Sequence, residues 1–318
     1  MRKRLHKILV TGGAGFIGSN LTERLLNEGY SVLSVDNFLL GKPEYIEPFR
    51  ENPKFAFKKT DLADLKRAIP VFKGVDTVFH LSSNSDIQEG AKHTDRDLNI
   101  GTRVTYNVLE AMRLNGVKNI IFASTSAVYG IAGQTPTRED YGPLFPISLY
   151  GASKLACEAL ISALCHNFGM RSWIFRFANV IGKNPTHGII FDLITRLKNK
   201  RHEIKVLGDG KQSKPYLHVS DIVDGMLFGF LNSKNDVNFF NLACDNASTV
   251  EFIVKTLLKK LKMENTKIIY TGGPQGWKGD VPRVRLSVEE MKKLGWRARF
   301  TSDEAVSRGI EEIIAQLW

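Results

Sequence analysis

A tyrosine and a lysine four residues apart, Tyr150 and Lys154, are the side chains in this sequence best suited to proton transfer. A helix is expected to begin at this point with Ser148 as its N-terminal cap, and residues four apart share one face of a helix. An ammonium group beside a phenol favours the phenolate and lowers the pKa of the tyrosine toward neutrality. A hydroxyl from the run Ser124-Thr125-Ser126, at the end of an adjacent strand, would complete a site that deprotonates an alcohol while hydride leaves the same carbon.

The four-residue spacing alone does not identify a catalytic pair, because Tyr150 could be a core aromatic and Lys154 a solvated surface residue. The N-terminal residues favour the catalytic interpretation over this alternative. An apolar strand at residues 8–10 runs into the glycine-rich turn Thr11–Gly18, which a helix at 19–28 and a second strand at 31–36 follow. This order is the dinucleotide-binding fingerprint in its required context, rather than a purely structural glycine turn.

The glycines of this turn allow a phosphate to approach the backbone closely, and the first turn of the following helix favours an anion. Two registers fit, one with Gly13, Gly15 and Gly18 and one with Gly12, Gly15 and Gly18. Asp36 stands eighteen residues after Gly18, near the usual offset of an acid that accepts the ribose hydroxyls. A carboxylate there would repel a 2′-phosphate, so the sequence predicts NAD rather than NADP.

Strands and helices alternate along the first 180 residues, which predicts an α/β fold of the Rossmann type with a doubly wound parallel sheet. Ligands of such sheets bind beyond the carboxyl ends of the strands, which is where the polar residues stand. After residue 180 the alternation loosens. We therefore expect an NAD-binding domain at 1–180 and a smaller mixed α/β lobe for the substrate at 181–318, interleaved with the first. The expected strands of the first domain lie at 8–10, 31–36, 55–61, 77–81, 119–124 and 171–178, with a long helix at 97–115.

Composition narrows the functional class. The chain has 44 Lys and Arg against 33 Asp and Glu, an excess of eleven positive charges. This excess suits nucleic acid or anionic nucleotide ligands, but the basic residues are not interleaved with aromatic ones, so no nucleic-acid partner is expected. No apolar stretch approaches the ~20 residues of a membrane span, and no signal-peptide pattern is present. Three cysteines without metal-ligand or disulfide spacing predict no bound metal and a cytoplasmic protein: Cys157, Cys165 and Cys244.

With these motifs in view, the chain resembles the extended short-chain dehydrogenases/reductases over essentially its whole length. Within that superfamily it is most similar to the UDP-glucose 4-epimerase group of nucleotide-sugar enzymes. Besides the motifs above, the resemblance is carried by Thr60-Asp61-Leu62, His80-Leu81-Ser82-Ser83, Asn107–Ala111, Ser124–Gly130, Arg176–Val180, Gly208-Asp209-Gly210, His218–Asp221 and Gly279-Asp280-Val281.

The resemblance implies a role for individual residues. Tyr150 would be the acid/base, Lys154 would tune it and hold the nicotinamide ribose, and Thr125 would bond the 4-hydroxyl of the sugar. Residues implied for NAD are Gly12, Gly15, Phe16, Ile17, Gly18, Asp36, Asn37, Asp61, Leu62, Leu81, Ser82, Ser83, Asn99, Ser124, Tyr150 and Lys154. Those implied for the UDP-sugar are Ser85, Thr125, Ser126, Asn179, Val206, Lys214, Tyr216, Lys278 and Asp280.

The chain departs from the family pattern where the diphosphate is held. Lys214 stands where relatives carry an arginine, which keeps the charge and loses the bidentate fork. A second arginine of the relatives is absent from Gly276-Trp277-Lys278. Either Lys278 substitutes for it, or Trp277 stacks on a ring, or the tryptophan covers an edge of the core. At the position that gates the sugar pocket in relatives, the small Val284 leaves room for an N-acetyl group.

The resemblance implies inversion at C4 of a UDP-hexose. Dehydratases usually carry an Asp-Glu pair where this chain has Ser126 and Ala127, and decarboxylases often carry a glutamate at the second position. UDP-glucuronate epimerase, dehydratase and reductase activities remain alternatives, as does a non-catalytic NAD- or RNA-binding protein. Family analogy favours a homodimer through the helices at 97–115 and 149–168, although their apolar positions could all serve the core of one chain.

Overall fold

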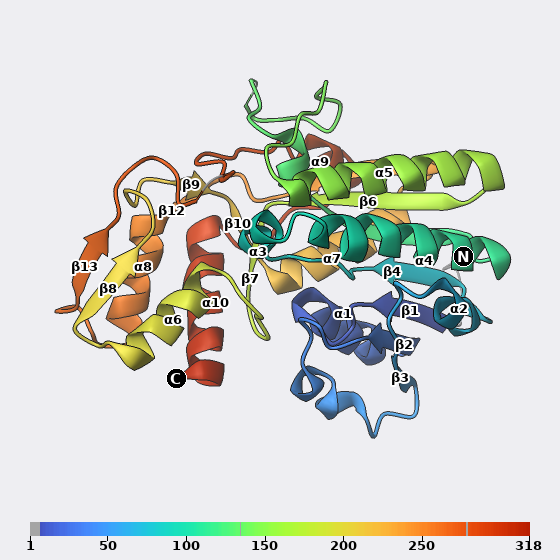
Figure 1. The fold of residues 1–318 in the computed structure, drawn as a ribbon, viewed down its shortest axis with the longest axis horizontal. Helices are drawn as coiled ribbons and strands as arrows, with labels where there is room; N and C mark the ends of the chain where they lie inside the picture. The colour runs from blue at the N-terminus through green and yellow to red at the C-terminus, as the bar shows by residue number, and fades with distance from the viewer. Residues whose placement is uncertain (1–6, 134, 278) are drawn as a thin grey trace.

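A parallel sheet of seven strands forms the centre of the molecule (Figure 1). The structure, a computed structural model, describes residues 7–133, 135–277 and 279–318, so the expected site residue Lys278 lies outside the described residues. The strand order is β11-β6-β5-β4-β1-β2-β3, and every neighbouring pair is parallel. The strands are β1 (Lys7–Thr11), β2 (Ser31–Asp36), β3 (Phe55–Lys59), β4 (Thr77–His80), β5 (Asn119–Thr125), β6 (Arg171–Phe177) and β11 (Val237–Leu242).

Two hydrophobic layers cover the faces of this sheet, because alternate residues of a strand point to opposite faces. In β1, Ile8 and Val10 pack into one layer and Leu9 into the other, and all three are fully buried. Helices α1 (Phe16–Asn27) and α7 (Val219–Asn232) lie together over the first face. Helices α4 (Arg103–Leu114) and α5 (Leu149–Phe168) cover the second. The predicted Rossmann-type fold is confirmed.

A smaller lobe lies beside the sheet, on the left of Figure 1. Its helices α6 (Ile189–Asn199), α8 (Val250–Lys260) and α10 (Ser302–Leu317) enclose a separate apolar core. The other α-helices of the described residues are α2 (Leu65–Ala68), α3 (Ile87–Lys92) and α9 (Glu289–Leu294), and short 3-10 helices lie at η1 (Pro43–Tyr45), η2 (Glu47–Phe49), η3 (Ile69–Phe72) and η5 (Ser126–Tyr129). The remaining strands are β7 (Asn179–Ile181), β8 (Glu203–Val206), β9 (Ser213–Lys214), β10 (Tyr216–His218), β12 (Ser248–Thr249) and β13 (Lys267–Tyr270), and they pair as β10-β7, β12-β9 and β13-β8.

The chain passes between the two parts more than once. After β7 and α6 it returns to the first part, where α7 packs against α1 and β11 becomes an edge strand of the large sheet. It then enters the smaller lobe again at α8. The boundary predicted at residue 180 stays a prediction, but no single cut separates the two cores.

Local differences from the expected elements are small. The strand expected at 55–61 ends at Lys59, and the long helix expected at 97–115 begins with a π-helical turn, η4 (Leu98–Thr102), before α4. In the described parts of the chain, none of the helices combines the length and apolar character that crossing a membrane requires.

Candidate active site

A cleft of about 910 Å³ lies along the carboxyl ends of the central strands and continues onto the smaller lobe. Its lining includes Gly12 after β1, Leu81 after β4 and Thr125 at the end of β5. From the smaller lobe come Lys214 and Asp280. The reversal of strand order between β4 and β1 opens such a crevice, because neighbouring connections leave the sheet on opposite faces. Of the expected site residues that the structure describes, all but Asn99 line this cleft.

The glycine turn presents backbone rather than side chains to the cleft. Gly12 has φ +68°, and a Cβ on it would lie 2.9 Å from the amide nitrogen of Ser82. A Cβ on Gly18 would collide with the carbonyl oxygen of Gly12. Gly12, Gly15 and Gly18 line the cleft, whereas the missing side chain of Gly13 makes room for Ser34 behind the turn. The second of the two possible glycine registers therefore faces the cleft.

Helix α1 starts directly after this turn. Its N-terminal cap is Gly15, and the first turn carries no acidic side chain. The opening N–H groups of a helix lack intrahelical acceptors and carry a partial positive charge, which suits a pyrophosphate. The backbone of this turn therefore fits the diphosphate of a dinucleotide.

Asp36 ends β2 beside this turn and is buried. Its carboxylate accepts hydrogen bonds from the backbone N–H of Ala14 at 3.1 Å and of Phe38 at 2.8 Å. Burial raises the pKa of the carboxyl group, and these backbone hydrogen bonds oppose that rise. Each carboxylate oxygen keeps a further lone pair, so the residue can still accept ribose hydroxyls as the sequence predicts.

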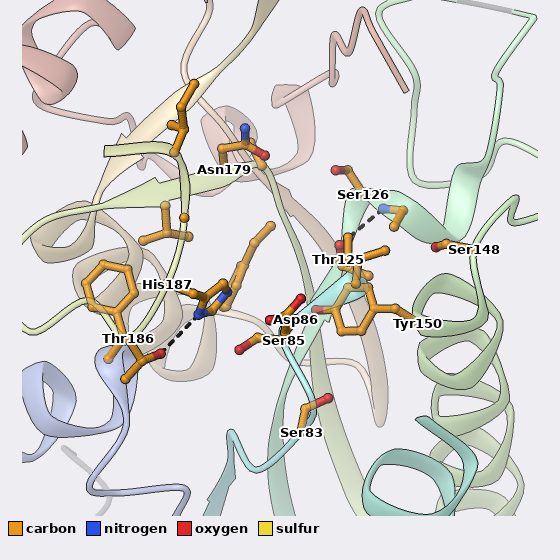
Figure 2. Close-up of a pocket in the computed structure, with 18 of the residues that line it drawn as sticks. Ser83, Ser85, Asp86, Thr125, Ser126, Ser148, Tyr150, Asn179, Thr186 and His187 are labelled. Atoms are coloured by element: carbon orange, nitrogen blue, oxygen red, sulfur yellow. Dashed lines mark hydrogen bonds between the residues drawn. The ribbon is translucent and has the colours of Figure 1, made fainter. Parts of the chain in front are cut away.

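Tyr150 and Thr125 meet in the cleft, as Figure 2 shows. The side chain of Ser148 accepts a hydrogen bond from the N–H of Gly151 at 3.1 Å, so the expected cap is present and fixes where α5 begins. Tyr150 lies in the first turn of that helix, and its side chain hydrogen-bonds Thr125 at the end of β5. The hydroxyl of Thr125 also accepts from the N–H of Ala127 at 3.2 Å, which orients it.

The sequence suggested that Lys154 lowers the pKa of Tyr150, and in this structure it does not. The buried ammonium donates to the carbonyl oxygen of Ala123 at 2.6 Å, and Nζ lies 5.9 Å from the centre of the Tyr150 ring. Burial lowers the pKa of Lys154 to about 8. Burial also raises the pKa of Tyr150, and the hydrogen bond with Thr125 offsets this only in part. The expected lowering of the Tyr150 pKa is therefore wrong in this structure, because desolvation of the phenol outweighs a cation that is turned toward a backbone carbonyl.

Two residues expected at NAD have their side chains engaged elsewhere. Asn99 lies in the π-helical turn, donates to Asp95 at 3.0 Å and does not line the cleft. Ser124 does line the cleft, but its hydroxyl donates to Glu158 at 2.5 Å inside the protein.

The part of the cleft in the smaller lobe contains an ion pair. Lys214 Nζ lies 2.5 Å from Asp280, and the N–H of Gly276 donates to the same carboxylate at 3.1 Å. Lys214 also lies 5.2 Å from the centre of the Trp277 ring. The indole N–H of Trp277 is buried and has no hydrogen-bond partner among the described residues. Trp277 lines the cleft, but its N–H is turned into the protein.

Sequence reasoning missed His187, which lies across the cleft from Tyr150 in Figure 2, and Asp86, which also lines the cleft. Nδ1 of His187 lies 3.0 Å from the hydroxyl of Thr186, and the ring also hydrogen-bonds the backbone of Ser85. Burial lowers the pKa of His187, so the ring is neutral near pH 7. Both residues follow strand ends, which is the one sequence signal that could have pointed to them.

This geometry agrees with what comparison with known proteins shows. The family model described as NAD dependent epimerase/dehydratase family matches residues 8–243. The chain belongs to this family. It therefore shares the Rossmann-type fold and the dependence on NAD of nucleotide-sugar modifying enzymes.

Relatives that catalyse different reactions are similar to this chain to about the same degree. The UDP-glucose 4-epimerase of Streptococcus mutans is 30% identical over 334 residues, covering 98% of this chain and 95% of the relative. The UDP-N-acetyl-alpha-D-glucosaminuronate decarboxylase of Bacillus cytotoxicus is 28% identical over 330 residues, covering 99% and 97%. Identity at this level supports the enzyme class and does not select one reaction.

Solved structures give the same class. A crystal structure of UDP-galactose 4-epimerase is similar with a TM-score of 0.88 at 34% identity, covering 98% of this chain and all of that one. The UDP-glucose 4-epimerase of Thermotoga maritima, solved with UDP-glucose, has a TM-score of 0.86 at 29% identity, with coverage of 98% and 100%.

Proposed function

We propose that this protein catalyses NAD-dependent 4-epimerisation of a UDP-hexose, interconverting UDP-glucose and UDP-galactose. One observation carries the proposal: the hydrogen-bonded pair of Tyr150 and Thr125 lies in the same cleft as the dinucleotide-binding turn. Similarity to epimerases over nearly the whole chain supports it.

In the proposed reaction Thr125 and Tyr150 both contact the 4-hydroxyl of the sugar. Thr125 orients the hydroxyl and Tyr150 accepts its proton. When bound, NAD supplies a hydride acceptor for C4, returns the hydride, and adds a positive charge to the site. Tyr150 then gives its proton back to the oxygen after the sugar has presented its opposite face. Because the raised pKa of Tyr150 opposes ionisation, the positive charges around it must stabilise the phenolate before it can accept the proton of the sugar hydroxyl.

The smaller lobe is proposed to hold the nucleotide while the sugar turns. Lys214 would pair with the diphosphate and Asp280 with the hydroxyls of the uridine ribose. Both residues are already paired with each other, so binding exchanges one ion pair for two ligand contacts. Trp277, which lines the cleft, would stack on a ring of the ligand. The roles proposed for Ser85, Ser126, Asn179, Val206 and Tyr216 rest on their place in the lining of the cleft.

Decarboxylation of a UDP-uronate is the second candidate, favoured by the similarity to the Bacillus cytotoxicus decarboxylase. The side chains after β5 argue against it, because Ala127 has no group that can transfer a proton. Val284, which lines the cleft, leaves room for an N-acetyl group and favours testing N-acetylated sugars as well.

The experiment that tests the proposal offers the purified protein UDP-galactose, UDP-N-acetylgalactosamine and UDP-glucuronate in parallel and identifies the products by NMR. Appearance of the C4 epimer of UDP-galactose or of UDP-N-acetylgalactosamine supports the proposal, whereas epimerisation of the uronate alone would identify a UDP-glucuronate epimerase instead. Loss of carbon dioxide from the uronate would establish the second candidate instead. If no sugar changes while RNA is retained on a filter, the protein is a binding protein and the proposed enzyme activity is wrong.

A homodimer in the cytoplasm is the proposed setting. Exposed apolar side chains, Leu98, Tyr106 and Leu114, lie on the η4–α4 segment, and Leu149 and Phe168 lie on α5. The three cysteines are free thiols at buried positions, which suits a reducing compartment.

A further inference from the structure

A buried ion pair lies directly behind the candidate catalytic residues. Glu158 of α5 and Arg176 of β6 are 3% and 4% exposed. The guanidinium approaches the carboxylate with two nitrogens, Nη2 at 2.7 Å and Nε at 3.1 Å. Such two-point contacts fix the orientation of both groups as well as their distance.

Glu158 completes a row of links between helix α5 and the end of strand β5. Tyr150, Lys154 and Glu158 are spaced four apart, so they share one face of the helix. They contact three consecutive strand residues: Tyr150 bonds Thr125, Lys154 bonds the carbonyl of Ala123, and Glu158 accepts from the hydroxyl of Ser124. Glu158 of the ion pair therefore holds Ser124, the middle residue of this strand segment. Tyr150 and Lys154 hold the two flanking residues, Thr125 and Ala123.

Arg176 extends the same network to Tyr129, which also lines the cleft, and to β11. Its Nη1 donates to the hydroxyl of Tyr129 at 2.9 Å, and that hydroxyl donates to Asn241 of β11 at 2.7 Å. The guanidinium also lies near two aromatic rings, 4.8 Å from the centre of Tyr129 and 5.2 Å from that of Phe239. Both the pair and its surroundings are therefore held in one arrangement by three strands and a helix.

Stability alone does not account for this arrangement. A buried ion pair costs desolvation energy, and replacing it with apolar residues of similar volume is often neutral or stabilising. Among the described residues, the hydroxyl of Ser124 makes no hydrogen bond other than the one to Glu158. This hydrogen bond therefore fixes the position of β5 against α5.

We propose that Glu158, Arg176 and Ser124 are positioning residues for the reaction, which keep the hydroxyl of Thr125 in register with Tyr150. The inference rests on the proposed function for its kinetic test only. A small displacement of reacting groups lowers the rate of the chemical step more than it lowers binding, because the nucleotide is held by other residues.

The test replaces Ser124→Ala, with Ser34→Ala as the matched control. Ser34 is a buried strand serine whose hydroxyl has no hydrogen-bond partner among the described residues. We expect Ser124→Ala to lower kcat about tenfold while KM for the UDP-sugar changes less than about twofold. Ser34→Ala should leave both unchanged. Equal kcat values for the two variants, each with full NAD content, would overturn the proposal.

A second variant removes both charges together, Glu158→Met with Arg176→Met, which leaves no unpaired buried ion. It should bind NAD and UDP with unchanged affinity and turn over at least tenfold more slowly. Normal turnover would show that the pair serves only the stability of the fold.

A third measurement does not depend on activity. In crystal structures, the Thr125 hydroxyl of the Ser124→Ala variant should lie beyond hydrogen-bond distance of Tyr150. An unchanged Tyr150–Thr125 hydrogen bond would contradict positioning even if the wild-type protein turned over none of the UDP-sugars, a result that would separately refute the proposed function.

Discussion

Tyr150 is the residue on which the proposed chemistry depends, and its phenol is the group to remove first. The Tyr150→Phe variant keeps the ring and loses only the hydroxyl that bonds Thr125. Losing a general acid/base typically lowers kcat by ~10²–10⁴-fold. We expect a loss in this range in the NMR assay, with NAD content and UDP affinity retained. Turnover within threefold of the wild type would mean that another group transfers the proton.

Lys154 gives the site a dependence on pH. Because burial lowers its pKa to about 8, its ammonium is present below that pH and is lost above it. Although the ammonium is bonded to the carbonyl of Ala123, it still places a positive charge 5.9 Å from the centre of the Tyr150 ring, which favours the phenolate, so kcat/KM should fall as the pH rises past about 8. In a Lys154→Arg variant the cation persists, and this basic limb should disappear even if the activity is lower. A basic limb that is unchanged in the arginine variant would assign it to another group.

Single residues also show what a sequence can and cannot predict. Gly12, Asp36 and the pair Tyr150/Lys154 were predictable because each belongs to a local pattern whose spacing the backbone dictates. The direction of the Lys154 side chain was not, because it depends on a carbonyl of a strand 31 positions earlier. His187 was missed for the same reason, since its partner Ser85 lies on a different part of the chain.

At the scale of elements, the start of helix α5 sets the position of the candidate catalytic residues. Removing its cap with Ser148→Ala should cost about 1 kcal/mol and lower kcat, because Tyr150 lies in the first turn. Thr301→Ala is the matched control, since Thr301 caps α10 in a capping box on the smaller lobe. It should cost a similar amount in thermal unfolding and leave kcat unchanged. The same kcat in both variants would show that the cap does not position Tyr150.

The elements themselves were largely predictable from apolar periodicity. Expected and observed bounds of the central strands differ by one or two residues, because fully buried parallel strands read as continuous apolar runs. The π-helical turn before α4 was not predictable, since residues 98–102 carry an ordinary helical pattern. The pairing of Glu158 with Arg176 likewise follows from how α5 lies on β6, which no local pattern encodes.

At the scale of the whole molecule, the apolar side chains on η4–α4 and α5 predict self-association. Leu98, Tyr106 and Leu114 are all more than 40% exposed in the single chain, and Tyr106 is 45% exposed. Tyr106→Glu should convert a dimer to a monomer in sedimentation velocity. Phe145→Glu, at a 73% exposed residue in the loop before α5, is the control and should leave the association unchanged. A wild-type protein that sediments as a monomer would refute the prediction.

The return of the chain to complete the large sheet with β11 restricts how such enzymes can be recombined. A chimera that takes its sugar specificity from a relative cannot be made by joining two halves at one junction, because the donor segment would carry away an edge strand and the helix α7 that covers it. Three separate grafts are needed, one from β7 to β10, one from β12 to β13 and one of α10, with the recipient's own α7, β11 and α9 kept, because α9 packs against both β11 and α7. Divergence of substrate preference by point substitution in the cleft, rather than by exchange of domains, is the outcome that this connectivity favours.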